Sequence, residues 1–399
     1  MKDKFFKIFD YCGEYSLYAL IIFIPISIAA IESFFGLIFM FFLLRKSLKP
    51  DFKFLRSPSY VFLLSYFIFI SFSLFNSGPN FNKSISALFL KWAENIMIYI
   101  IVQDTLCNYK RVRNCLIVLL STALLIGIDA LFQRFIGIDF LRHKTMVALY
   151  GETIPRAVTA SFSHYNSFGA YLIVILSLLL AMLISVKDKV YRLSVFLLLI
   201  LMQLCLILTF SRGSWMGFFA VLIIMLFLSP KVNKLIYVFF IFIMVMIFLP
   251  GIRERALFIF SPGGDTDRFV IWKGTFSMIK EHPFLGMGLG TYMDYFRPFV
   301  KKGLIQYAHN CYLQIWAETG IFALISFILF IGSIFYKGIK AFKIKNSNFA
   351  LLGFICALFG TLVHIFFDNH LYSLQLSALF WLMLGVIVAL TKQEEEAVK

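Results

Sequence analysis

The chain has 399 residues, of which 61% are hydrophobic and 15% are charged, and its mean hydropathy is +0.87. These values exclude an ordinary soluble domain, and solidly apolar runs of about 20 residues exclude a transmembrane barrel, whose strands alternate apolar and polar positions. A net charge of +16 would suggest nucleic acid for a soluble protein. In a membrane protein it first indicates orientation, because Lys and Arg gather in cytoplasmic loops. We therefore expect an all-α polytopic membrane protein without a nucleic-acid partner.

Apolar windows bounded by charged or turn residues predict about twelve transmembrane helices. The first two windows are short and nearly continuous, so they fit either a hairpin or one kinked segment. In chain order the predicted spans are Ser16–Ile31, Phe34–Leu44, Tyr60–Phe75, Ile85–Val102, Cys115–Phe132, Asn166–Val186, Leu193–Phe210, Ser214–Leu228, Leu235–Leu249, Cys311–Tyr336, Leu351–Phe367 and Tyr372–Leu390.

Short loops predict the orientation of these spans. Arg45-Lys46, Lys110-Arg111 and Lys337 all fall on the side of the N-terminus, which makes that side cytoplasmic and places both termini there. The predicted organisation is nine spans in residues 1–250, a large periplasmic loop with amphipathic helices in 251–310, and three spans with a cytoplasmic tail in 311–399.

Neither a metal nor a cofactor is expected. The six cysteines are scattered without a CxxC pair, so they indicate no metal centre, haem attachment or disulfide framework. Gly286, Gly288 and Gly290 precede no βαβ unit, so they are not a dinucleotide fingerprint. Their backbone N–H groups offer a weak signal for anion binding.

The predicted outer side is rich in cations between Arg134 and Lys302. Long loops are translocated regardless of charge, so the topology permits this excess without requiring it. One interpretation is a basic loop that touches anionic lipid headgroups, and the other is a cationic shelf for an anionic lipid-linked substrate. The cations of the long outer loops include Arg156, Arg253, Arg255, Arg268, Lys273, Lys280, Arg297, Lys301 and Lys302.

Two of the arginines stand out by position. Ser211-Arg212-Gly213 separates two spans with almost no loop. An arginine at the membrane boundary is costly unless paired, which makes Arg212 a functional candidate, with a snorkelling side chain as the alternative. Arg268 falls in the first turn of a helix predicted from Thr266 or Asp267 to Lys280, which we expect to lie on the outer leaflet. The apolar positions of this helix are Phe269, Trp272, Phe276 and Ile279.

A third feature is His309-Asn310 at the start of the tenth span, with Glu318 further along it. A single histidine in such a place is more often structural, but two arginines at the same membrane face favour a site. Glu318 would either orient His309 or form contacts within the bundle.

Two further pairs leave alternatives open. Lys91 and Glu94 inside the fourth span form either an ion pair near a lipid phosphate or a buried structural pair. Asp368 and His370 in the last outer turn are interpreted as solvated turn residues rather than as a metal or acid pair.

Residues 162–321 resemble the O-antigen ligase and polymerase superfamily, bacterial membrane glycosyltransferases of the GT-C type. The matching residues are Ser163-His164-Tyr165-Asn166, Ser211-Arg212-Gly213, Arg268 with Trp272, His282-Pro283 with Gly286, Gly288 and Gly290, and His309-Asn310 with Leu313, Glu318 and Gly320.

The resemblance implies an enzyme of the bacterial inner membrane that acts at its periplasmic face. Its donor would be an undecaprenyl-diphosphate-linked glycan and its acceptor a hydroxyl of lipid A–core, among membrane lipids. Arg212 and Arg268 would bind the diphosphate and His309 would assist the acceptor, in a metal-independent, inverting transfer. The expected substrate-binding residues are Asn310, Ser211, Asn166, Arg156, Lys91 and Glu318.

The sequence leaves alternatives to the ligase open. A polymerase of the same superfamily would use a second lipid-linked glycan as acceptor, and a protein O-oligosaccharyltransferase would use a protein. A flippase for lipid-linked glycans would show paired half-repeats and polar residues near mid-membrane. The sequence shows no convincing repeat, and its polar residues concentrate at the outer boundary, so an enzyme is favoured.

Overall fold

The computed structural model describes residues 1–52, 57–147, 156–229, 266–300, 306–345 and 348–397, together with 248, 253 and 254. Within these residues the chain is helical, and its only β-structure is two isolated bridges, one of which joins Ile138 to Thr145. Eight of the described helices are long and apolar enough to cross a membrane. This supports the predicted all-α polytopic fold. Apart from residue 248, the predicted span Leu235–Leu249 lies outside the described residues, so the total of twelve spans stays a prediction.

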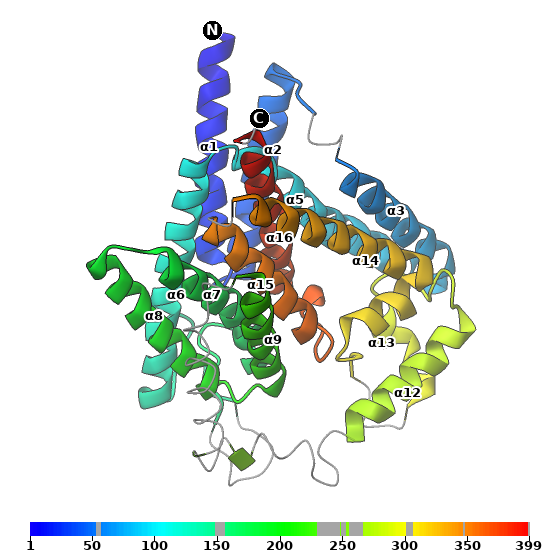
Figure 1. Cartoon of the computed structure of the whole chain (residues 1–399). Coiled ribbons are helices and arrows are strands. Elements are labelled where there is room, and N and C mark those ends of the chain that lie inside the picture. The colour runs from blue at the N-terminus through cyan, green and yellow to red at the C-terminus, as the bar shows by residue number, and fades with distance from the viewer. Residues whose placement is uncertain are drawn as a thin grey trace.

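The chain opens with two antiparallel helices, α1 (Lys2–Phe23) and α2 (Ile28–Leu48), which pack along each other (Figure 1). The hairpin alternative is therefore correct, but the predicted boundary is wrong, because the expected span Ser16–Ile31 runs across the turn. Pro25 lies in that turn, and the Ser27 hydroxyl accepts a backbone N–H of the first turn of α2 at 3.4 Å. Apolar residues continue on both sides of the turn, which hides it from hydropathy.

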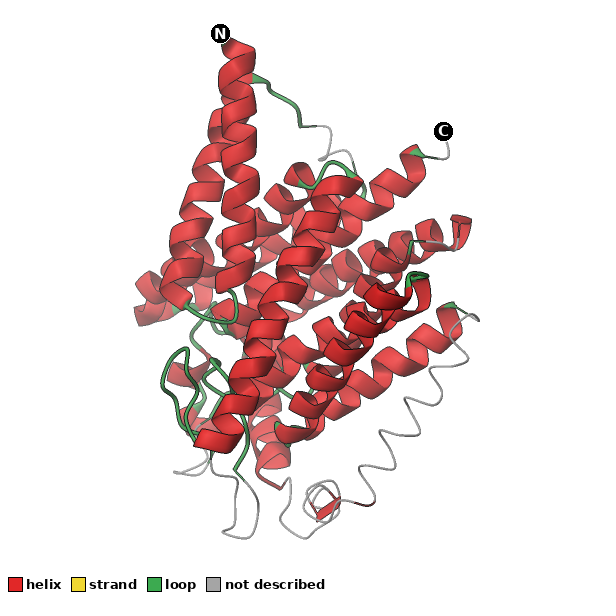
Figure 2. Ribbon diagram, turned by 90° about the vertical axis from the view of Figure 1, so that its left-hand side faces the viewer, coloured by secondary structure: helices red, strands yellow, loops and turns green. Residues whose placement is uncertain are grey.

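The other helices complete a bundle that has both termini at one end, whereas α12 and α13 lie toward the other end (Figures 1 and 2). Short 3-10 turns precede α4 and α16, and a π-helical turn, Leu88–Ala93, joins α4 to α5. The helices are α3 (Ser59–Phe72), α4 (Phe81–Ala87), α5 (Glu94–Thr105), α6 (Tyr109–Ile136), α7 (Tyr165–Ser185), α8 (Lys189–Leu208), α9 (Arg212–Leu228), α12 (Thr266–Glu281), α13 (Tyr292–Tyr295), α14 (Cys311–Lys345), α15 (Phe349–His364) and α16 (Leu374–Glu396). The helix predicted around Arg268 is confirmed as α12.

Helices α7, α9 and α15 pack unusually closely, because glycines face one another where they cross. A Cβ atom on Gly217 of α9 would lie 2.9 Å from the carbonyl oxygen of Gly360 on α15, and a Cβ on Gly169 of α7 would lie 2.0 Å from the Ser214 hydroxyl. Small residues allow such backbone approach in membrane helices. The consequence is that the start of α9, with Arg212, lies beside the end of α15.

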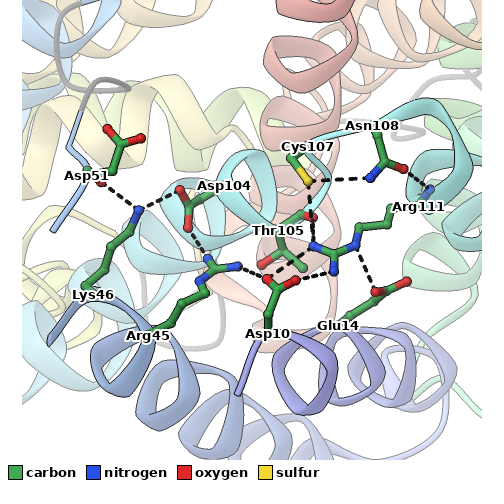
Figure 3. Close-up of polar contacts among 10 residues, drawn as sticks. All are labelled: Asp10, Glu14, Arg45, Lys46, Asp51, Asp104, Thr105, Cys107, Asn108 and Arg111. Carbon is green, nitrogen blue, oxygen red and sulfur yellow. Dashed lines mark hydrogen bonds and ion pairs between the residues drawn. The ribbon is translucent and has the colours of Figure 1, made fainter. Parts of the chain in front are cut away.

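A network of ion pairs ties four helices together at the end that carries the termini (Figure 3). Arg111 of α6 contacts Asp10 at 2.5 Å and Glu14 at 2.8 Å, both on α1. Arg45 of α2 contacts the same Asp10 at 2.5 Å and also contacts Asp104 of α5. Both arginine side chains are nearly buried, so the charges depend on one another for solvation.

We expect Arg111→Met to destabilise the protein, because it removes the positive charge that neutralises the carboxylates of Asp10 and Glu14. Loss of one partner from a fully buried pair costs about 3–5 kcal/mol, and partial exposure of Asp10 should reduce this to roughly 2–3 kcal/mol. The measurement is the melting temperature in detergent. Lys110→Met, at the exposed neighbouring position, is the control, and equal melting of the two variants would contradict the stabilising role.

Candidate functional site

Polar side chains from five separate elements converge at the end of the bundle away from the termini. Asn166 comes from the first turn of α7, Arg212 from the start of α9 and His364 from the end of α15. Asp368 lies in the turn between α15 and α16, and His309 directly precedes the first residues of α14. The site is therefore formed by residues at, or next to, the ends of helices.

Asp368 is the centre of this arrangement. One carboxylate oxygen lies 3.4 Å from Nδ1 of His309 and accepts the backbone N–H of Asn369 at 2.8 Å. The other accepts the side-chain amide of Asn166 at 2.6 Å. The interpretation of Asp368 as a solvated turn residue is wrong, because its side chain is only 15% exposed. The turn is held against α14, where the Cys311 backbone N–H donates to the Ile365 carbonyl at 2.9 Å.

The surroundings of Asp368 favour its ionised form. Burial alone would raise the pKa of this carboxyl, but the imidazoles of His370 and His309, and the hydrogen bond from His309, hold the pKa well below its usual range. His370 is also an inner residue of this turn rather than a solvated one, since it is 5% exposed, and burial lowers its pKa. Asp368 therefore stays a carboxylate near neutral pH.

His309 is oriented by contacts on both ring nitrogens. Nδ1 faces Asp368, and Nε2 lies 3.2 Å from the side-chain oxygen of Gln306. When Nδ1 carries the proton and donates it to the carboxylate, Nε2 keeps its lone pair and is able to accept a proton. In this tautomer the Gln306 amide has to turn its NH₂ group toward Nε2, because two acceptors do not form a hydrogen bond. The backbone of His309 has φ +47°, a left-handed conformation that non-glycine residues adopt with strain and that is concentrated at functional sites.

Arg212 and Arg268 line one small pocket. Its other lining residues are Tyr165, Asn166, Gly213, His364 and Phe367. Asn166 thus belongs both to the pocket and to the hydrogen bonds of Asp368. The two guanidiniums therefore meet in one pocket, whereas His309 is not among its lining residues and is linked to it through Asp368 and Asn166.

A buried chain of hydrogen bonds continues from Asn166 into the bundle. The Ser211 hydroxyl caps α9, donates to the Asn166 side-chain oxygen at 2.7 Å and lies 2.7 Å from the Ser214 hydroxyl. Ser214 in turn lies 3.3 Å from Nε2 of His364. Sequence reasoning singled out Ser211 and Asn166 but missed Ser214 and His364. Ser214 could have been predicted as a site residue, because it is a polar residue only two positions from Arg212.

Asn310 and Glu318 have structural contacts. The Asn310 side chain caps α14 by accepting the Leu313 backbone N–H at 3.0 Å. Glu318 does not orient His309, so that option is wrong. Its carboxylate accepts the Gly290 N–H at 2.9 Å and the Gln314 amide at 3.2 Å, and it thereby anchors the glycine segment to α14.

The glycine segment packs against a distortion of α14 at Gly320, where φ is 82° and ψ is 172°. The backbone N–H groups of Gly286, Gly288 and Gly290 donate to His282 O, Glu318 O and Glu318 Oε2, respectively. They are consequently occupied, and the idea that they cradle an anion is wrong. Their role is close packing.

Gly286→Ala is expected to destabilise the segment that links α12 to α14. Gly286 has φ +70°, and an added Cβ would lie 2.3 Å from the Glu318 carbonyl carbon, whereas nothing lies within 4 Å of a Cβ at Gly332. We expect a loss of about 2 kcal/mol or more from left-handed strain and overlap. Gly332→Ala is the control, and an unchanged melting temperature for Gly286→Ala would contradict this account.

Lys91 and Arg156 are not brought to the pocket. The Lys91 ammonium lies 5.4 Å from the centre of the Tyr372 ring. Among the described contacts Lys91 forms no ion pair with Glu94, which has one buried oxygen without a hydrogen-bond partner; the predicted pair is therefore wrong. Arg156 is exposed. Roles for Lys91 and Arg156 in substrate binding stay predictions.

The fold and site thus define a polytopic helical membrane protein with an oriented imidazole–carboxylate pair beside two arginines. Residues 197–328 match the family model described as O-antigen ligase. This match bears out the resemblance to the O-antigen ligase and polymerase superfamily over residues that include Arg212, Arg268 and His309.

A relative from Haemophilus influenzae (strain ATCC 51907 / DSM 11121 / KW20 / Rd), described as an uncharacterized protein, is 26% identical over 271 residues. The alignment covers 59% of this chain and 63% of the relative. The chain therefore spans less than two thirds of that relative's length.

Proposed function

We propose that the protein is an O-antigen ligase that transfers a glycan from undecaprenyl diphosphate to a hydroxyl of lipid A–core. The reaction would take place at the periplasmic face of the bacterial inner membrane, with both termini in the cytoplasm and residues 251–310 as a periplasmic loop. One observation carries the proposal. Arg212 and Arg268 line a pocket that shares Asn166 with the Asp368–His309 pair.

The two arginines would act on the donor. Cleavage of the bond between the anomeric carbon and the phosphate oxygen leaves undecaprenyl diphosphate, so negative charge grows on the leaving group. Guanidinium groups match phosphate geometry with two parallel N–H donors and keep their charge at any working pH. Because α9 is held by α7 and α15, and α12 by α14, the two guanidiniums would stabilise that charge without large reorganisation.

His309 and Asp368 would act on the acceptor. As the acceptor oxygen forms its bond to the anomeric carbon, Nε2 of His309 takes the hydroxyl proton, and the carboxylate of Asp368 stabilises the resulting imidazolium. Attack opposite the leaving diphosphate inverts the anomeric centre in one displacement. The proton is later released to water, and no covalent glycosyl intermediate is required.

The acceptor separates the ligase from a polymerase of the same superfamily. A deletion strain scored for surface polysaccharide tests this directly. Loss of all glycan-capped core indicates the ligase, whereas core that carries a single repeat unit indicates a polymerase and would overturn this assignment.

Glycan transfer in isolated membranes is expected to survive EDTA, because the arginines supply the positive charge that a divalent metal supplies in other glycosyltransferases. The measurement is the transfer rate before and after chelation. Activity that is lost with EDTA and restored by added Mg²⁺ or Mn²⁺ would contradict the assigned role of Arg212 and Arg268.

A further inference from the structure

An apolar groove opens toward lipid in the half of the bundle that is remote from the pocket of Arg212 and Arg268. Helix α3 packs on α14 and α5 packs on α16, and the groove lies between α3 and α5. Val61 and Leu64 on its rim are 64% and 60% exposed. Its lining residues are Tyr60, Val61, Leu63, Leu64, Phe67, Ala93, Ile96, Met97 and Ile100.

The face of α5 that lines this groove changes from apolar to polar along its length. Residues three, four, seven, ten and eleven positions apart share one side of a helix. This side is formed by Ala93, the last residue of the π-helical turn, and by Ile96, Met97 and Ile100 of α5, followed by Gln103 and Asp104. The Gln103 amide donates to the Tyr60 hydroxyl at 2.5 Å, and this hydrogen bond marks the boundary between the two parts.

Beyond that boundary lies a polar pocket with charges of both signs. Lys337 of α14 reaches into it and donates to the Ser57 hydroxyl at 2.8 Å. In the described part of the chain, Lys337 forms no ion pair with a carboxylate. Glu395 and Glu396, at the exposed end of α16, line the same pocket. The lining also includes Asp51, Asp104 and Lys392. A pocket that holds an ammonium beside two hydroxyls, together with several carboxylates, suits a ligand with one phosphate and one amine.

The dimensions agree with a single membrane leaflet. From the boundary at Gln103 to Ala93 the face is about 15 Å long at 1.5 Å per residue. Half of a hydrocarbon core of about 30 Å is about 15 Å. An acyl chain along this face of α5 would therefore reach from the polar pocket to about the middle of the bilayer.

We propose that this groove and pocket together bind one phospholipid with an ethanolamine headgroup, from the leaflet at the end of the bundle that carries the termini. Its acyl chain lies between α3 and α5, its phosphate contacts Lys337 with Ser57 and Ser59, and its ammonium faces Glu395 and Glu396. A phosphatidylglycerol headgroup has no cation for the two glutamates, so it fits less well. This site is separate from glycan transfer and does not depend on the proposed function.

Native mass spectrometry of the full chain, released from membranes with equal phosphatidylethanolamine and phosphatidylglycerol, tests the proposal. We expect one retained phosphatidylethanolamine. Lys337→Gln should weaken its retention roughly tenfold, about 1.4 kcal/mol, whereas Lys340→Gln, at an exposed position of the same helix, should not. Ala93→Trp should fill the groove and abolish retention, and Leu204→Trp, on the lipid-exposed face of α8, should leave it unchanged.

Three outcomes would overturn the proposal. They are the absence of any retained lipid in the unmodified chain, equal retention of the two lipids, or retention that neither Lys337→Gln nor Ala93→Trp alters. The relative retention of the two lipids by the unmodified chain shows which headgroup the site prefers, and this result does not depend on the folding of any variant.

Discussion

Replacing His309 with Ala is expected to lower the rate of glycan transfer by about 10²–10⁴-fold, the range for loss of a general base. Nε2 is the atom of the Asp368–His309 pair that faces away from the carboxylate and is able to take the acceptor proton. The measurement is transfer from a lipid-linked glycan to core in membranes that contain equal amounts of each protein. Near-normal transfer by His309→Ala would remove this residue from the mechanism.

Asp368→Asn tests whether Asp368 orients the His309 imidazole or only stabilises the fold. The amide keeps the size of the side chain but removes the negative charge, so the imidazole loses the partner that fixes its tautomer and stabilises its cation. We expect a fall in maximal rate with donor binding largely preserved. Binding of donor that falls as much as the rate would indicate a structural role for Asp368 instead.

The second large effect is expected from the two arginines. Arg212→Ala or Arg268→Ala should raise the transition-state free energy by about 1.5–3 kcal/mol for each lost charge-assisted contact. Because both guanidiniums line one pocket, we expect the double variant to depart from additivity. Lysine at either position should restore activity only in part, since its ammonium lacks the planar fork that matches phosphate.

Lys280→Ala is the matched control for Arg268→Ala. It removes a cation from an exposed position of the same helix, α12, so it reports on bulk positive charge. A loss equal to that of Arg268→Ala, or full rescue by lysine, would favour general attraction of anions over a specific grip on the diphosphate.

Sequence reasoning performed best where a property is local to one segment. The helix around Arg268 was predicted within a few residues, because a capping residue and a helical apolar period are read from adjacent positions. The first span was misplaced because apolar residues continue through the turn at Pro25. Hydropathy measures how apolar a segment is, and it does not register where its backbone reverses.

The site itself was predicted only in part. Arg212 was found because a charged residue between two spans is costly and therefore informative, Arg268 because it falls in the first turn of a predicted helix, and His309 because it stands at the start of a span. Asp368 was misjudged because its turn follows apolar helix α15, and its burial arises from contacts with residues 59 and 202 positions away, His309 and Asn166. The weak signal for anion binding by the glycine segment was wrong for the same reason, because Glu318 of α14 accepts the N–H groups of Gly288 and Gly290.

The sequence by itself determined the membrane class, most of the described helices and three of the candidate residues, Arg212, Arg268 and His309, because apolar length, helix starts and the cost of burying charge are properties of short segments. The tertiary structure alone decided which polar groups meet. It paired Asp368 with His309, placed both arginines on one pocket and assigned Glu318 to the glycine segment, because those contacts depend on how closely α7, α9, α14 and α15 approach one another.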